Sequence, residues 1–98
     1  MKATLRPEAE EDLESAAHWY EERRQGLGGR LLHTTGLIAE NPRRYPRIHG
    51  EIRRAVTPRF PFGVFYLMEG DAVVVIAVMH ASRDPARWKE RAERQGTL

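Results

Sequence analysis

The strongest pattern of hydrophobic positions lies in the second half of the chain, between residues 53 and 85. Val, Ile, Phe and Tyr dominate this stretch, and such residues suit the pleated surface of a sheet. Gly70 and Asp71 separate two apolar runs. Because glycine readily takes the positive φ that a primed turn needs at its first central position, the pattern predicts a β-hairpin formed by residues 63–69 and 72–80.

Both faces of this hairpin are apolar. An antiparallel sheet with one face in water should alternate apolar and polar residues, and residues 72–80 do not. The expected faces are Val73, Val75, Ala77 and Met79 on one side, and Val74, Ile76 and Val78 on the other. Other elements, or a partner, must therefore cover both faces.

Two helices are predicted in the first half of the chain. Pro7 suits the first helical turn, and the acidic residues that follow suit the positive end of the helix dipole. Gly26 is a candidate C-cap of the first helix, and Asn41-Pro42 ends the second. So short a link predicts an antiparallel helical hairpin. The residues expected to pack on one face of the sheet share helical spacing: Leu13, Ala17, Tyr20, Leu31 and Ile38.

The remaining segments complete a β-α-α-β-β-β order. Ala3–Arg6 is predicted as a first strand, residues 41–50 as an irregular basic loop, and Ala86–Arg94 as a last short helix. Ile52–Arg59 is predicted as a strand, and Pro58, which cannot donate to a ladder, indicates an edge or a bulge there.

We therefore expect one α+β domain spanning residues 1–98. Its N-terminal strand and small, mainly antiparallel sheet would carry the helical hairpin on one face. The short C-terminal helix would cover only part of the other face. A large exposed apolar patch usually marks a partner site, so the pattern predicts a groove for another chain.

The charge of the chain is segregated, although its net value is only +2. Residues 1–22 are acidic, whereas residues 23–59 hold nine Arg against two Glu. Arginine offers a planar fork that matches carboxylate and phosphate groups. The basic span is thus a candidate recognition surface, with a solvated Arg-rich surface as the alternative interpretation.

Composition argues against several other classes of protein. The chain has no Cys, so a disulfide framework and a thiol nucleophile are excluded. We expect no signal peptide, no membrane helix and a cytoplasmic location. The four His lack metal-ligand spacing and no phosphate-loop motif is present, so neither a metal nor a cofactor is expected.

Three segments, in order, resemble the RelE/ParE superfamily of toxins, and most closely its ParE-like branch of plasmid stabilisation proteins. They are Leu5–Leu13, Ile52–Arg54 leading into Arg59–Tyr66, and Val75–Pro85. The resemblance spans about residues 3–90. It implies a type II toxin neutralised by a cognate antitoxin whose C-terminal segment wraps around it, and contact with operator DNA only through that antitoxin.

The resemblance leaves the target open between two branches. ParE-like members are associated with inhibition of DNA gyrase, whereas RelE-like members cut messenger RNA on the ribosome without a metal. No Tyr follows Tyr66, so the C-terminal Tyr of many RelE-like nucleases is absent, which favours gyrase inhibition by a protein that is not an enzyme. A ribosome-dependent endoribonuclease and a nontoxic, autoregulatory binding module are the alternatives.

The candidate site residues follow from these two interpretations. Catalysis would need an acid or base and cations around the phosphate, for which the candidates are His80, Arg83 and Arg59. A structural role at a strand end is the more common one for a lone His. The residues expected to contact a target or an antitoxin are Arg53, Arg54, Arg59, Arg83, Phe65, Val74 and Ile76.

Overall fold

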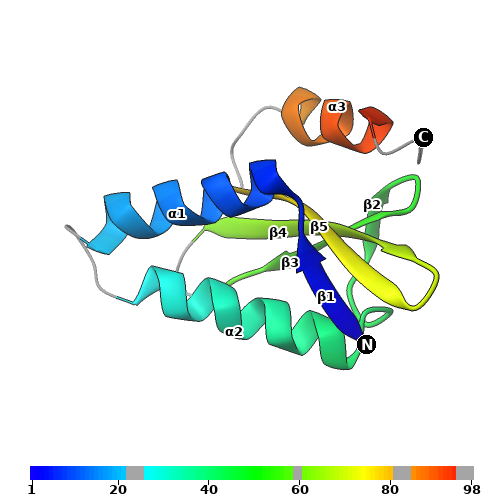
Figure 1. Ribbon diagram of the computed structural model, residues 1–98, viewed down its shortest axis with the longest axis horizontal. Coiled ribbons are helices and arrows are strands. Elements are labelled where there is room, and N and C mark those ends of the chain that lie inside the picture. Colours follow the sequence, from blue (N-terminus) through cyan, green and yellow to red (C-terminus); the bar gives the residue numbers. More distant parts are fainter. Residues whose placement is uncertain (22–25, 59–60, 81–84, 95–98) are drawn as a thin grey trace.

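The computed structural model describes residues 1–21, 26–58, 61–80 and 85–94 (Figure 1). In chain order, these ranges form β1 (Lys2–Leu5), α1 (Pro7–Glu21), α2 (Leu27–Glu40), β2 (Arg47–His49), β3 (Ile52–Val56), β4 (Phe62–Glu69), β5 (Ala72–His80) and α3 (Ala86–Arg94). The predicted α+β class, with a helical hairpin between the first strand and the rest of the sheet, is confirmed. Within these ranges, every helix is too short or too polar to cross a membrane.

The five strands form one mixed sheet in the order β1-β5-β4-β3-β2. The first strand runs parallel to β5, with Leu5 opposite Val75, and the other neighbours are antiparallel. The predicted hairpin is β4–β5, and Gly70 in its turn has a φ of 57°. That left-handed conformation explains why glycine stands at this position.

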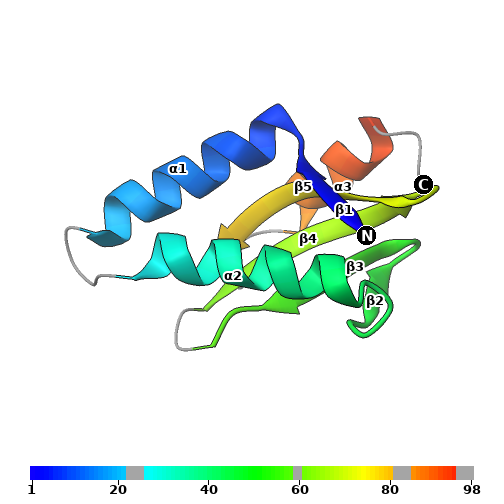
Figure 2. The ribbon, with the colours of Figure 1, turned by 60° about the horizontal axis from the view of Figure 1, so that its bottom comes forward.

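The helical hairpin covers one face of the sheet (Figure 2). Leu31 and Ile38 of α2 are fully buried there, and Leu13 of α1 is partly buried against the same cluster. Ala17 is also half-buried, whereas the side chain of Tyr20 lies outside the described part. The central core beneath the hairpin comes from Val64, Tyr66, Val73, Val75 and Val78.

The predicted alternation along β5 is wrong after Val75, because the strand bulges. Tyr66 is paired with Val75 and Phe65 with Ala77, so Ile76 is the extra residue. Ile76 and Ala77 consequently both face the side away from the helical hairpin, and Val78 returns to the hairpin side. A bulge inserts one residue and thereby inverts the facing of all residues beyond it.

The second face of the sheet is covered, contrary to the predicted open groove. Trp88 and Ala92 of α3 are buried against this face, and Ile48 of β2 packs at its border. Residues from three strands that lie beneath them are buried: Ile52, Phe65, Leu67, Val74, Ile76, Ala77 and Met79. A nine-residue helix is sufficient because Trp88 contributes a large ring and the β2–β3 hairpin adds to the cover.

The segment around β2 and β3 also differs from expectation. Arg47–His49, expected within an irregular loop, is a short strand that forms the edge of the sheet. As a result, β3 lies inside the sheet. The strand ends at Val56 rather than at residue 59. Pro58 lacks the N–H needed to extend the ladder, and Arg59 is outside the described residues.

Gly26 lies at the N-cap of α2 with a φ of 101°. Glycine therefore provides the left-handed conformation at the start of the second helix. The predicted C-cap role at the end of the first helix depends on residues 22–25, which lie outside the described residues.

Candidate functional site

Arg54 projects from β3 onto the face that α3 covers in part. Its partner across the β3–β4 ladder is Phe65, which belongs to the cluster on that face. The side chain is half-buried, and its aliphatic stem lies over Gly63 of β4. Within the described ranges its guanidinium makes no hydrogen bond or ion pair. An arginine whose stem is packed and whose guanidinium has no such partner is a ready site for an anionic group.

Arg53, the neighbouring residue, has a different environment. It is paired with Tyr66, whose ring lies in the core under the helical hairpin. The Arg53 Nη1 donates to the carbonyl oxygen of Tyr45 at 2.5 Å and to that of Arg43 at 3.3 Å. Arg53 therefore holds the basic loop against the sheet, so the two adjacent arginines do not act as one patch.

The same loop is held from the core by Tyr66. Its hydroxyl donates to the Pro42 carbonyl oxygen at 2.5 Å, and its ring meets that of Tyr45 edge-on at 6.5 Å. Burial raises the pKa of Tyr66 to about 12, although the nearby Arg53 charge acts in the opposite direction.

This pKa predicts a loss of stability at alkaline pH. A tyrosine in the unfolded chain titrates near pH 10, so the stability contributed by protonated Tyr66 is complete below about pH 10 and is lost as the pH rises towards 12. Tyr66→Phe should therefore lose less stability over this interval than the unchanged protein. Urea unfolding midpoints from pH 9 to 12 test this, with Tyr45→Phe as the control. Parallel curves for all three proteins would contradict it.

An aromatic stack fixes α3 on its face of the sheet. The Trp88 ring lies 5.2 Å from that of Phe65 in a stacked arrangement, and the His49 ring of β2 meets Trp88 edge-on at 5.9 Å. Lys89 places its Nζ 5.7 Å from the Trp88 ring centroid, within the range of a cation–π contact. The cover thus joins α3, β2 and β4.

The apolar side chains expected to contact a partner lie beneath this cover. Phe65, Val74 and Ile76 are 3%, 6% and 1% exposed, respectively. They share one cluster with Trp88. The structure brings Arg54 beside Phe65 at the border of this cluster, so the charged side chain, rather than the three apolar ones, is open to a ligand.

His80 lies on the other face of the sheet. It is opposite Phe62 in the β4–β5 ladder, and the two rings meet edge-on at 5.6 Å. Phe62 belongs to the cluster under the helical hairpin, so the sheet separates His80 from Arg54. Arg59 and Arg83, the cations proposed to act with His80, lie outside the described ranges. In the part that is described, no group of three or more potential metal ligands gathers.

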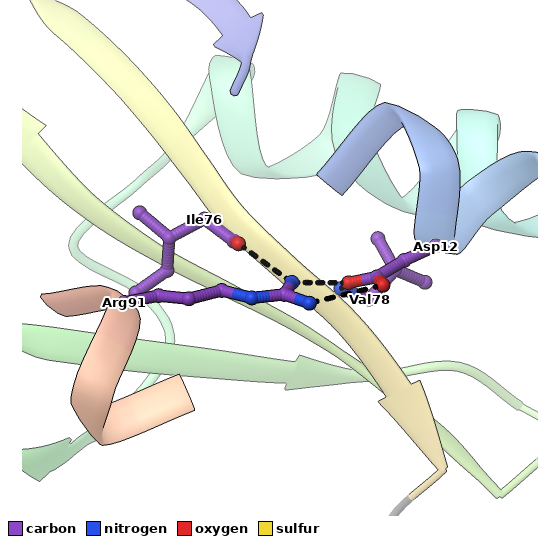
Figure 3. A network of polar contacts seen from close by, with 4 residues as sticks. All are labelled: Asp12, Ile76, Val78 and Arg91. Carbon is purple, nitrogen blue, oxygen red and sulfur yellow. Dashed lines mark hydrogen bonds and ion pairs between the residues drawn. The ribbon is translucent and has the colours of Figure 1, made fainter. Parts of the chain in front are cut away.

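A polar network at the edge of β5 was not predicted (Figure 3). The Arg91 guanidinium of α3 binds the Asp12 carboxylate of α1 at 2.5 Å and 3.3 Å, a two-point contact. Asp12 also accepts from the Val78 N–H at 3.0 Å, and Arg91 donates to the Ile76 carbonyl oxygen at 3.1 Å. We call these four residues the β5 clasp. Its side chains satisfy backbone groups of β5 beyond the end of β1.

The sequence does contain a signal for the clasp. Asp12 shares a helical stripe with Ala9 and Ala16, and Arg91 lies between Trp88 and Ala92, so both charges stand on stripes that pack inward. A charged residue on a buried stripe needs a partner of opposite charge. The local sequence indicates only that Asp12, like the other acidic residues after Pro7, suits the positive end of the helix dipole.

Comparisons with known proteins agree with this fold. The family model described as ParE toxin of type II toxin-antitoxin system, parDE, matches residues 3–85. A solved structure, described as "Chromosomal ParDE TA system from P. aeruginosa", superposes with a TM-score of 0.71 at 12% identity. The match covers 82% of this chain and 95% of that one. At so low an identity the structural likeness shows the fold alone. No curated protein matches the chain significantly.

The family model extends from the first residues of β1 through β5 and includes the helical hairpin, Arg54 and Gly63. It thus covers far more than half of the chain, which is too much to reflect one shared motif. The chain belongs to the ParE family, the toxins of type II toxin–antitoxin systems.

Proposed function

We propose that this toxin is held inactive by a cognate antitoxin and that, when released, it inhibits DNA gyrase. The observation that carries the proposal is the family match over residues 3–85. The placement of His80 also supports it, because the sheet separates this group from Arg54, whereas a nuclease needs its proton-transfer group and its cations around one phosphate. The protein acts in the cytoplasm, where gyrase and its DNA substrate are found, as part of a module that stabilises its plasmid.

The proposed antitoxin contact is centred on Arg54. Arg54 is half-buried, and its guanidinium is available to a carboxylate from an antitoxin segment that is disordered alone and folds on binding. Arg53 contributes indirectly, through the loop that it holds. Arg59 and Arg83 remain proposed contacts at positions outside the described ranges. The buried cluster beneath α3 and beside Arg54 includes Phe65, Val74 and Ile76.

Gyrase inhibition is tested by comparing DNA supercoiling with protein synthesis. After induction from a tightly repressed promoter, plasmid DNA should lose negative supercoiling before protein synthesis falls. The purified toxin should inhibit gyrase in a supercoiling assay, and the product of the adjacent antitoxin gene should restore the activity.

His80→Ala separates the two possible targets. We expect this variant to arrest growth as the unchanged toxin does. If instead ribosome-bound messenger RNA is cleaved, and cleavage falls by roughly 10²–10⁴-fold in His80→Ala, the protein is an endoribonuclease and the gyrase proposal is wrong. Normal supercoiling together with normal protein synthesis would mean that the chain is a nontoxic binding module.

A further inference from the structure

Gly63 is an unexpected residue near the start of β4. Its neighbours Phe62, Val64, Phe65 and Tyr66 are all large, and Gly63 itself is buried. Glycine inside a strand costs stability, and it often marks a place where another group approaches the backbone closely. The positive φ angles among the described glycines belong to Gly26, Gly50 and Gly70, so backbone conformation does not explain this one.

The space above Gly63 does explain it. A Cβ at this position would lie 3.1 Å from both Cγ and Cδ of Arg54 and 3.2 Å from Cε1 of Phe65. Ordinary contacts of a methyl group with carbon atoms are longer. A methyl group at residue 63 would therefore crowd the Arg54 stem and displace it from β4 by a few tenths of an ångström.

This placement leaves Arg54 prepared for a ligand. The other arginines with defined roles already have oxygen partners: Arg91 binds Asp12, Arg47 binds Glu51, and Arg53 binds loop carbonyls. Arg54 has no such partner in the described part of the chain. Because its stem is already packed, binding would immobilise fewer rotatable bonds than binding by a fully solvated arginine.

We propose that Gly63 is the positioning residue of a preformed carboxylate site whose binding group is the Arg54 guanidinium. The inference rests on the proposed antitoxin. The group that the site would bind is one acidic side chain in an otherwise apolar segment of that antitoxin. A single guanidinium fork beside Phe65 and its apolar cluster matches such a segment. A nucleic-acid backbone would need several cations along its path, and Arg53, the adjacent cation, is bound to its loop on the other face.

The first test follows folding and needs no partner. Adding a methyl group at residue 63 should lower the urea unfolding midpoint when Arg54 is present. In an Arg54→Ala background the same Gly63→Ala change should cost less, because the Cγ and Cδ atoms that it meets are gone and only the contact with Phe65 remains. Gly29→Ala on α2 is the control, since nothing lies within 4 Å of its added Cβ. An equal effect of Gly63→Ala in both backgrounds would overturn the positioning role.

The second test measures affinity for the purified product of the adjacent antitoxin gene by calorimetry. Arg54→Ala should weaken binding by about 10–100-fold, the usual range for a hydrogen bond to a charged group. Arg54→Lys should recover only part of this loss, because a point charge replaces a fork. Gly63→Ala should also weaken binding, and the double variant should bind no worse than Arg54→Ala alone.

The outcomes separate the site from the wider proposal. Unchanged affinity in Arg54→Ala, with antitoxin bound normally, would overturn the site and leave the toxin–antitoxin assignment intact. Failure of the unchanged protein to bind the antitoxin would count against the proposed function itself. If Arg54→Ala instead weakens binding of a 20-nucleotide single-stranded RNA with a steep salt dependence, the ligand is phosphate and the carboxylate proposal is wrong. If Gly63→Ala does not fold, the affinity of Arg54→Lys for the antitoxin still tests the carboxylate site.

Discussion

Arg91→Ala is expected to destabilise the protein by about 2–3 kcal/mol, because it leaves the Asp12 carboxylate partly buried without its counter-charge. The two side chains are only 14% and 18% exposed, well below the exposure of surface ion pairs, whose contributions are small. The change also removes the donor to the Ile76 carbonyl, which adds a desolvation cost. We expect the unfolding midpoint in urea to fall accordingly.

The control for this prediction lies on the same helix. Arg94→Ala removes an exposed basic residue from α3 and should change stability by no more than about 0.5 kcal/mol. The double variant Asp12→Ala/Arg91→Ala should be more stable than the sum of the single effects predicts, since neither charge is then left alone. If Arg91→Ala unfolds at the same urea concentration as Arg94→Ala, the β5 clasp does not hold α3 and α1 to the sheet.

Strong local periodicity made most of the elements predictable. The hairpin of residues 63–69 and 72–80 and the helix Ala86–Arg94 were expected at nearly their observed bounds. Turn chemistry at Gly70 supplied the remaining signal. β2 was missed because a three-residue strand is too short to show alternation. Its pairing with β3 is a tertiary fact that the basic loop sequence does not encode locally.

The prediction of which β5 side chains lie on which face of the sheet was wrong for a different reason. Val73–Met79 is apolar throughout, so the sequence holds no polar residue that marks where alternation changes sides. The bulge at Ile76 lies where the ladder with β1 ends and where Asp12 and Arg91 bind the freed backbone groups. Asp12, which is 66 positions from Val78, and Arg91, which is 15 positions from Ile76, thus stabilise it, and no local pattern could have located it.

The sequence predicted that the candidate site contains basic residues, but not which of them is available to a ligand. Basic residues at 53 and 54 were expected together, but adjacent strand positions face opposite sides of a sheet. Register and packing decide that Arg53 holds the loop and that Arg54 is available to an anion. Gly63 was not interpreted from sequence, because its role depends on the side chain that crosses it from the neighbouring strand.

The cover over the second sheet face changes how its variants must be interpreted. On an open groove, Val74→Asp would test partner binding directly. Val74 is instead only 6% exposed within the cluster that contains Trp88. A loss of toxicity or of antitoxin binding in this variant would therefore report unfolding unless its fold is measured first.

Val74→Asp is expected to remove a large part of the stability of the protein at 25 °C. An aspartate here must either keep its charge in an apolar cluster or bind a proton at neutral pH, and the free-energy cost, on the order of 3–5 kcal/mol, is a large fraction of the stability of a small domain. Val56→Asp is the matched control, because Val56 is 52% exposed and its replacement should shift stability by only about 0.5 kcal/mol. Near-ultraviolet circular dichroism and urea unfolding of both variants test the difference. A Val74→Asp protein that keeps native stability and loses only antitoxin binding would show that this face is open in solution, as the sequence pattern first indicated.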